Sequence, residues 1–309
     1  MGLRKDIWRS AICMASIEDI VARGAIGDAP VHWLPPMSKP FQFLADPFGF
    51  WRDGKLHVFA EAYDYRDRIG KIELFVYDEA FCLLSRCIVL SEPWHLSYPF
   101  VFEAEGEIWM LPEAFRSGAL TLYRAVSFPH RWEPECRIDL GDDIPVDATV
   151  TFHDGLWWMF YTPARPGSSR PGCLNVAYAE HIRGPWTRHP LNPVRTDSAS
   201  TRPGGTAKSF DGRVMLPVQD CSWTYGGAIR PLWFDALTPE IVLTHAGGKI
   251  GIPPRFGRHR EGMHTLSAAG DVTLIDVKRT EFSPRGLSIE AIREGKKLMR
   301  RFSQKHPLA

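Results

Sequence analysis

The sequence lacks an excess of charge of either sign and has no long hydrophobic run. Its 37 Lys and Arg residues nearly balance its 36 Asp and Glu residues, which gives a formal net charge of +1. Because a balanced surface does not attract polyanions, we expect no nucleic-acid partner. No stretch reaches the roughly 20 apolar residues that a membrane-crossing helix needs, so we expect a soluble protein without a membrane span.

Several other signals are missing as well. The six cysteines are scattered, with no Cys-x-x-Cys pair of the kind that zinc sites use. A core of this size needs no disulfides, so we expect free thiols in a reducing compartment. Arg9, Ser10, Glu18 and Asp19 interrupt the N-terminal segment where a signal peptide is apolar, which predicts a cytoplasmic location. The sequence motifs of lipases, zinc proteases, P-loop proteins and dinucleotide-binding proteins are also absent.

A recurring β-hairpin is the strongest positive signal. Each copy has two alternating strands around a two-residue turn that contains glycine, as in Asp53-Gly54. The five copies begin at Pro47, Tyr98, Ala148, Gly205 and Gly262, and the later turns are Glu105-Gly106, Asp154-Gly155, Asp211-Gly212 and Gly270-Asp271. In the first four copies two more strand-like runs follow each hairpin. Four strands repeated at a spacing of roughly 50 residues are typical of propeller blades.

The fifth hairpin has no outer strands after it, but the N-terminus offers two unassigned strands, at residues 7–15 and 31–35. We therefore predict an all-β, five-bladed propeller over residues 1–283, closed by its N-terminal strands, because closure leaves few exposed sheet edges. Residues 284–309 form a C-terminal tail, in which residues 287–306 are expected to be a short helix with Ser288 as N-cap. We expect its basic end to be solvated, and contact with an anionic membrane or partner stays open.

Polar residues should meet on one face of such a propeller. The first strand of each blade lines the central channel and the second returns to the same face, so starts of first strands and ends of second strands converge. The starts carry Asp46, Ser97 with Tyr98, Asp147, Arg202 and His264, and the ends carry Glu61, Glu113, Thr162, Gln219 with Asp220, and either Asp276 or Lys278. The Asp-Gly turns lie on the opposite face.

We assign the candidate catalytic carboxylates first. They are Asp46, Asp147, Glu113 and Asp220, because sugar chemistry commonly uses paired carboxylates. Each has a simpler alternative: Asp46 precedes a proline and could only start a turn, and Asp220 could only stabilise its own loop.

The candidate substrate-binding residues surround these acids. They are Glu61, Ser97, Tyr98, Arg202, Gln219, Trp223, Tyr225 and His264. Arg202 could bind a substrate carboxylate or phosphate, or pair with a neighbouring Asp. His264 could be a satisfied core histidine or lie beside a structural cation on the axis, and we expect no other cofactor.

The segments LADPF, HLSYPFVFE, VDATVTFHDG, RPGG, QDCSWTYGG and GMHT resemble the N-terminal domain of the glucosamine inositolphosphorylceramide transferase family over roughly residues 45–265. The chain is more distantly similar to the furanosidase propellers of glycoside hydrolase families 43 and 32. The hydrolase resemblance implies a base on blade one, a pKa-tuning Asp on blade three and a general acid on blade four. Asp46 and Asp147 match the first two, whereas Arg202 to Gly205 replace the expected Glu-Gly-Pro, so the acid is missing or moves to Glu113 or Asp220.

These observations leave two main hypotheses about function. The first is a hydrolase-like, glycan-processing enzyme that acts on a carbohydrate or glycoconjugate, with Asp46 as base and Glu113 or Asp220 as acid. Because these residues belong to different blades, we expect the wide carboxylate spacing of an inverting enzyme. The second is a catalytically silent propeller that binds a glycan for a glycosyltransferase partner. Nucleotide-sugar-dependent transfer by this chain itself ranks last, because the chain lacks the paired aspartates that would bind the metal.

Overall fold

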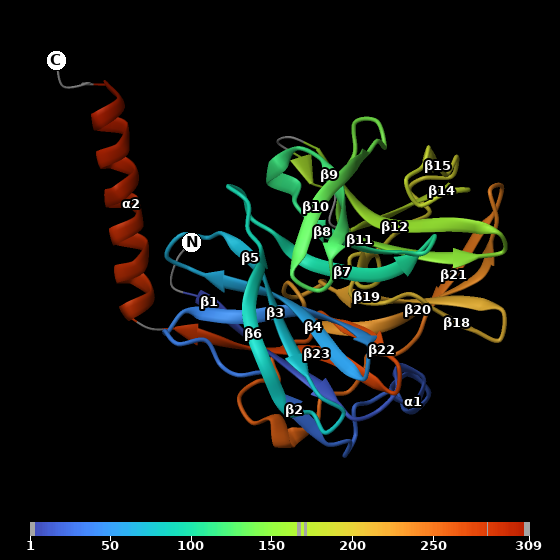
Figure 1. Cartoon of the computed structure of the whole chain (residues 1–309), viewed down its shortest axis with the longest axis horizontal. Coiled ribbons are helices and arrows are strands. Elements are labelled where there is room, and N and C mark those ends of the chain that lie inside the picture. Colours follow the sequence, from blue (N-terminus) through green and yellow to red (C-terminus); the bar gives the residue numbers. More distant parts are fainter. Residues whose placement is uncertain (1–3, 166–167, 170–171, 283, 306–309) are drawn as a thin grey trace.

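The computed structural model describes residues 4–165, 168–169, 172–282 and 284–305. Its strands form five sheets arranged in a ring, and these are the blades of a β-propeller (Figure 1). The predicted fold class is therefore confirmed. No helix among the described residues is long and apolar enough to cross a membrane.

The first two blades are regular four-stranded meanders. Blade 1 contains β3 (Gln42–Arg52), β4 (Lys55–Asp64), β5 (Gly70–Tyr77) and β6 (Leu83–Leu90). Blade 2 contains β7 (Ser97–Ala104), β8 (Glu107–Glu113), β9 (Leu120–Ser127) and β10 (Arg131–Ile138), with the 3-10 helix η1 (Phe115–Ser117) between β8 and β9.

The next two blades are more interrupted. Blade 3 contains β11 (Ile144–His153), β12 (Leu156–Arg165), β14 (Cys173–Ala179) and β15 (Thr187–Arg188), with β13 (Ser168–Ser169) and β16 (Arg195–Thr196) at its edges. Blade 4 contains β17 (Arg202–Pro203), β18 (Lys208–Phe210), β19 (Arg213–Asp220), β20 (Ala228–Leu237) and β21 (Val242–Ala246), followed by the 3-10 helix η2 (Pro254–Phe256).

The N-terminal segment completes blade 5, as predicted. This sheet has the order β2-β1-β23-β22, with β22 (Leu266–Ala269) and β23 (Val272–Phe282) joined by β1 (Arg4–Cys13) and β2 (Val31–Trp33). Strand β1 pairs antiparallel with β23 along its whole length, from Arg4 opposite Phe282 to Cys13 opposite Thr273. The two ends of the chain thus close the ring.

The hairpin turns have the backbone conformation that their sequences predict. Asp53 and Gly54 both have positive φ, 51° and 67°, and the Glu105, Asp154 and Asp211 turns repeat this pattern. Two successive positive φ values define the type I′ turn, whose twist matches that of the flanking strands.

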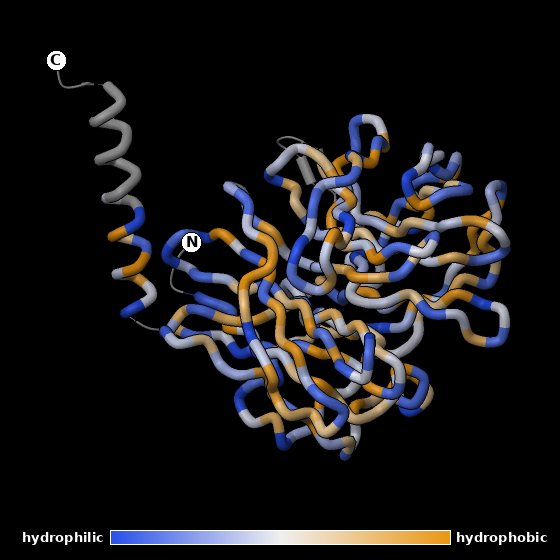
Figure 2. The backbone as a smooth tube through the Cα atoms, in the orientation of Figure 1, coloured by the Kyte–Doolittle hydropathy of each residue, from blue (hydrophilic) through white to orange (hydrophobic). Residues whose placement is uncertain are grey.

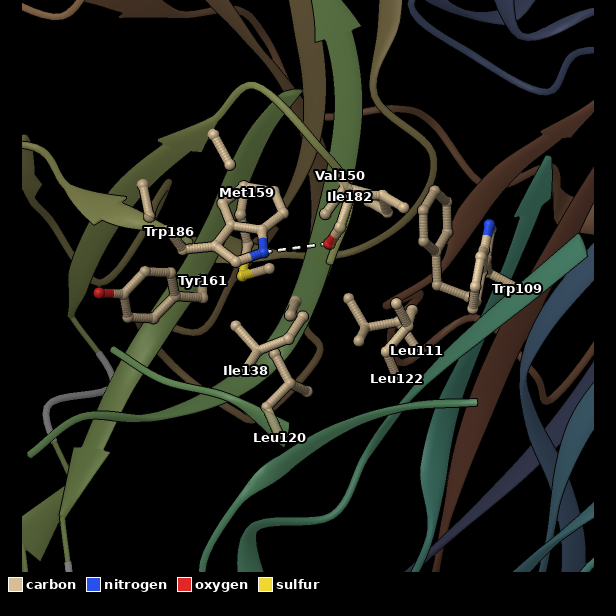
Figure 3. Packing of buried hydrophobic residues seen from close by; sticks show 14 of the residues in the cluster. Trp109, Leu111, Leu120, Leu122, Ile138, Val150, Met159, Tyr161, Ile182 and Trp186 are labelled. Atoms are coloured by element: carbon tan, nitrogen blue, oxygen red, sulfur yellow. Dashed lines mark hydrogen bonds between the residues drawn. The ribbon is translucent and has the colours of Figure 1, made fainter. Parts of the chain in front are cut away.

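The hydrophobic core consists of clusters between neighbouring blades. Figure 3 shows the cluster between blades 2 and 3, where Trp109 and Leu111 of β8 and Met159 and Tyr161 of β12 are buried. The Trp186 indole there donates a hydrogen bond to the Ile182 carbonyl, 3.1 Å away. Apolar residues recur along the strands of every blade (Figure 2), which is why the sheets pack face to face around the axis.

Two helices flank the propeller. Helix α1 (Ile17–Arg23), which the sequence analysis did not predict, lies between β1 and β2 and is N-capped by Ser16, whose hydroxyl accepts the Asp19 amide hydrogen. The C-terminal helix α2 (Pro284–Lys305) begins earlier than predicted. Its first residue is proline, which suits the first turn of a helix. The expected N-cap at Ser288 is therefore wrong, and the Ser288 hydroxyl instead donates to the Arg285 carbonyl.

Candidate functional site

Three blades have the same β-bulge near the start of their first strand. Strands β3, β7 and β11 each have one residue more than their partner strand, between Ala45 and Phe48 in β3 and at the equivalent places in β7 and β11. The bulged residues Asp46, Tyr98 and Asp147 have φ of 47°, 48° and 52°. Non-glycine residues rarely adopt this left-handed conformation, and bulges of this kind recur beside active sites, where they redirect a side chain.

Asp46, His264 and Asp276 form a buried cluster at the junction of blades 1 and 5. His264 Nδ1 lies 2.6 Å from Asp276 Oδ2, and its Nε2 lies 3.7 Å from Asp46 Oδ1. Burial opposes a charge on His264, but Asp276 and Asp46 outweigh it and raise the pKa of His264. Burial raises the pKa of Asp46 to about 6, while His264 opposes the rise and Asp276 and Asp147 add to it.

Aromatic rings enclose His264. The Trp8 ring stacks on it with centroids 3.6 Å apart, and Tyr225 meets it edge-on at 5.4 Å. Because Trp8 comes from β1, the N-terminal strand contributes directly to the site as well as closing the ring.

We tested whether this cluster fits the axial cation considered from the sequence. Asp46, His264 and Asp276 each offer a ligand atom, and these atoms lie within 4.8 Å of one another. The Asp46 oxygens, however, accept hydrogen bonds from the Thr265 hydroxyl and the Tyr98 amide. The Asp276 oxygens accept three backbone N–H groups in addition to the imidazole. Each carboxylate oxygen of the cluster thus accepts a hydrogen bond from the protein, and a cation on the axis stays a prediction.

Glu113 ends strand β8 and faces the same space. The Ser97 hydroxyl donates to its Oε2 over 3.0 Å, and the Phe115 amide donates to its Oε1 over 2.6 Å. Burial raises the pKa of Glu113 to about 7, and the charge of Asp147 adds to the rise. A carboxyl group held in this way is both a proton donor and a proton acceptor near neutral pH.

Glu61, at the equivalent position of β4, is held by His95. The Gly70 amide donates to His95 Nδ1, so the ring proton of the neutral imidazole lies on Nε2, which is 3.5 Å from Glu61 Oε1. Burial lowers the pKa of His95 to about 4, which keeps the ring neutral. Burial and the nearby Asp46 and Glu113 raise the pKa of Glu61 well above its usual range, which favours the neutral form of this carboxyl group.

Asp147 is paired with blade 4. Its Oδ2 accepts hydrogen bonds from Arg202 Nε at 2.6 Å and from Gln219 Nε2 at 3.1 Å. The Arg202 guanidinium also lies over the Tyr225 ring, 5.0 Å from its centroid. Arg202 thus occupies the blade-four position as the ion-pair partner of Asp147, one of the two alternatives that the sequence left open.

Side chains from all five blades line one cavity of about 490 Å³. Most of the predicted residues contribute to its wall, together with several that the sequence analysis did not single out. The predicted residues are Asp46, Glu61, Ser97, Glu113, Arg202, Tyr225 and His264, and the others include Asp6, Trp8, Phe43, Tyr63, Tyr65, His95 and Phe115. Buried acids together with aromatic rings are a suitable lining for a sugar, whose apolar faces stack on such rings.

Five predicted residues lie elsewhere than in the cavity wall. Asp147 and Gln219 lie behind Arg202. The Tyr98 side chain is fully buried, and its hydroxyl bonds to Thr149 and to the Gly205 backbone. Trp223 is 93% exposed on its loop.

The fifth, Asp220, is ion-paired with Arg230 and Lys249, each 3.1 Å away. Burial would raise its pKa, but Ser222, Lys249 and Arg230 outweigh this and lower the pKa of Asp220 to about 2. An ionised carboxylate cannot be the general acid, so of the two predicted alternatives only Glu113 has the required chemistry.

His95 and Trp8 were not predicted as site residues. His95 lies two residues before Ser97 in the HLSYPFVFE segment. Its position just before a first strand could have indicated that it belongs to the site. Trp8 carried no such signal, because its place depends on the register of β1 against β23.

The glycine pair in blade 4 has a structural explanation. Gly205 has φ of 147° and pairs with Leu266 of blade 5, and a Cβ at this position would lie 1.9 Å from the Leu266 carbonyl oxygen. Only glycine allows this contact between blades 4 and 5.

Comparison with known proteins identifies relatives of most of the chain. The family described as glucosamine inositolphosphorylceramide transferase 1, N-terminal, matches residues 32–243. Proteins named glucosamine inositolphosphorylceramide transferase 1 are 38% identical in Oryza sativa subsp. indica and 36% identical in Arabidopsis thaliana, over 205 residues or 65% of this chain. The alignments cover only 27% and 26% of those proteins, so the chain spans about a quarter of their length.

Solved structures share the fold at low sequence identity. A family 117 glycoside hydrolase, Zg3597 from Zobellia galactanivorans, has a TM-score of 0.55 at 13% identity, covering 82% of this chain and 90% of that one. A putative glycoside hydrolase from Bacteroides ovatus has a TM-score of 0.52 at 13% identity, covering 77% and 92%. These matches establish a fold shared with glycoside hydrolases. On the evidence of the sequence matches, the chain belongs to the family of glucosamine inositolphosphorylceramide transferase N-terminal domains.

Proposed function

We propose that this chain processes a glycan, by hydrolysis of a glycosidic bond, in the central cavity, to whose wall all five blades contribute. Glu113 donates a proton to the leaving oxygen as the bond from that oxygen to the anomeric carbon breaks. Asp46 accepts a proton from the water that forms the new bond to the same carbon. The two carboxyl groups have the corresponding pKa values, about 7 for Glu113 and about 6 for Asp46.

One observation carries this proposal. Glu113 is buried at the wall of the cavity that also contains Asp46, and it is held by Ser97 and Phe115 with its pKa near neutrality. Asp147 contributes through its charge, which raises the pKa of Glu113 without lining the cavity. Because Asp46 and Glu113 belong to different blades, we propose that the reaction inverts the anomeric centre.

A catalytically silent, glycan-binding propeller is the second candidate. The Arg202–Asp147 ion pair at the blade-four position supports it, because the hydrolase resemblance implies an acid there. In this case the glycan is bound for a glycosyltransferase partner, and the relatives are named as transferases and are much longer than this chain.

Substitutions at the two carboxyl groups separate these functions. We expect wild type to release 4-nitrophenol from at least one member of a panel of 4-nitrophenyl pyranosides and furanosides. Asp46→Asn and Glu113→Gln should each lower turnover by roughly 10²-fold or more, because each removes a proton-transfer group while keeping the side-chain shape.

Matched controls lie on β8 and directly after β3. Asp53→Asn changes an aspartate of positive φ in the exposed turn after β3, and Glu107→Gln changes the half-exposed start of β8. Both should keep wild-type turnover. Binding of the same glycosides by all variants, with no turnover by wild type, would contradict hydrolysis and support the glycan-binding function.

A further inference from the structure

Helix α2 leaves the propeller beside the site. Strand β23 carries Asp276 into the buried cluster and runs on to Phe282, and α2 begins at Pro284. In its second turn, Ile289 packs against the apolar group that includes Trp8 and Phe43, two residues of the cavity wall. From there α2 extends away from the blades (Figure 1). A partner of α2 is therefore held on the cavity side of the molecule.

The propeller contacts α2 largely through polar groups. Glu290 accepts hydrogen bonds from Lys5 Nζ and, at 2.8 Å, from Arg68 Nη2, and it pairs with Arg293 of the same helix at 2.5 Å. Leu287 and Ile292, by contrast, are 47% and 60% exposed. A helix that packs on a protein core normally turns its apolar side inward, and here most of that side faces outward.

The helix sequence repeats this apolar spacing. At 100° per residue, the apolar residues of the sequence at positions 291, 298, 299 and 302 have the helical spacing of Leu287 and Ile292, interrupted only by Ser288 and Gly295. Positions 289 and 290, which contact the propeller, have a different spacing. Figure 2 shows hydrophobic and hydrophilic residues alternating along the first turns of α2.

The helix is strongly basic, although the whole molecule is nearly neutral. Residues 284–305 contain seven Lys and Arg residues against two Glu, whereas the whole chain has a formal net charge of +1. A broad apolar face combined with strong positive charge is characteristic of helices that lie in the headgroup region of anionic membranes.

We propose that α2 is an amphipathic anchor that binds the surface of an anionic lipid bilayer, with its apolar face inserted between the headgroups. A second copy of the chain fits less well, because pairing two apolar faces would bring two strongly basic helices together. The apolar sector is also wider than the narrow seam of a coiled coil. Resting on the proposed function, the anchor holds the cavity beside the membrane surface.

Co-flotation of the full chain with vesicles tests the anchor. We expect wild type to float with vesicles of equal parts phosphatidylcholine and phosphatidylglycerol, and to bind phosphatidylcholine vesicles much more weakly. Neutralising four charges with K296Q, K297Q, R300Q and R301Q together should weaken binding to the anionic vesicles by roughly 100-fold or more. Ile292→Glu should abolish it, because a charge would enter the apolar face.

Leu243→Glu is the matched control, since Leu243 is 57% exposed on strand β21 of blade 4 and should not affect vesicle binding. Glu113→Gln should bind vesicles like wild type. The vesicle test therefore does not depend on whether the proposed hydrolysis is correct. Equal binding of wild type and Ile292→Glu would overturn the anchor. A second result would also overturn it: wild type does not bind vesicles but forms a dimer in analytical ultracentrifugation, and Ile292→Glu disrupts that dimer.

Discussion

At the scale of single residues, burial determines the chemistry of the site. Glu113 has an ordinary carboxyl pKa of 4.5 when exposed, and its pKa is raised to about 7 in the folded protein. The pKa of Asp46 rises from 3.8 to about 6 by the same cause. Both groups therefore bind protons more tightly in the folded protein than in the unfolded chain.

This difference predicts that Glu113 stabilises the folded protein less as the pH rises. Glu113 binds a proton more tightly in the folded state between pH 4.5 and about 7, so its contribution to the free energy of unfolding decreases across that window and levels off above it. The raised pKa of His264 acts in the same direction, and the lowered pKa of His95, about 4, acts in the opposite direction. The test is therefore the difference between two proteins. Urea unfolding at a series of pH values should show that Glu113→Gln loses less stability than wild type from pH 5 to pH 8, by a few kcal/mol at most. Equal pH dependence of the two proteins would contradict the raised pKa of Glu113.

Tyr98 illustrates a residue whose position was predicted and whose orientation was not. Its backbone amide hydrogen-bonds to Asp46 Oδ2 at the axis, but its hydroxyl points inward and accepts the Gly205 amide hydrogen at 2.7 Å. The spacing of the hairpins placed it at a first-strand start. The direction of its side chain depends on the left-handed backbone and on blades 3 and 4, which local sequence does not reveal.

We therefore expect Tyr98→Phe to affect stability rather than binding. The substitution leaves the buried Gly205 amide without its partner, which should cost about 1–3 kcal/mol in the free energy of unfolding. Urea titration measures this cost, and glycoside affinity, measured in parallel, should stay unchanged. A large loss of affinity at unchanged stability would mean that Tyr98 contacts the substrate.

At the scale of elements, the hairpins were predictable because each carries its own local signals. Alternating strands and glycine turns identified all five, and an unpaired fifth hairpin pointed to the N-terminal strands. Helix α1 was missed because it is only seven residues long, although Ser16 before it is a typical N-cap. The start of α2 was misplaced because Ser288 resembles a cap, whereas Pro284 determines the first turn.

The closing strand gives a prediction at this scale. Removing residues 1–36 deletes β1 and β2, including the fully buried Ile12, and leaves the long edge of β23 unpaired. We expect the shortened chain to lose cooperative thermal unfolding, followed by circular dichroism. Removing residues 284–309 is the control, and it should leave a cooperative transition because α2 lies outside the ring (Figure 1). An unchanged melting curve without residues 1–36 would contradict closure by β1.

At the scale of the whole molecule, the ring brings together groups that are far apart in the sequence. Asp46 and Asp276 come from opposite ends of the chain and meet because blade 5 closes against blade 1. The convergence of first-strand starts could be predicted from topology alone. The sequence left two roles open for Arg202, binding a ligand or pairing with an aspartate. The ion pair with Asp147 depends on side-chain geometry between two blades, which the sequence does not reveal.

The most direct test of the account is a crystal structure of Asp46→Asn with a bound glycan. The substitution should preserve the fold, because asparagine also tolerates the left-handed conformation of position 46, whose φ is 47°. We predict a sugar in the 490 Å³ cavity with its anomeric carbon between residue 46 and Glu113, and with the Glu113 carboxyl facing the glycosidic oxygen. A glycan bound outside this cavity, or inside it with its anomeric carbon turned away from both residues, would contradict the account.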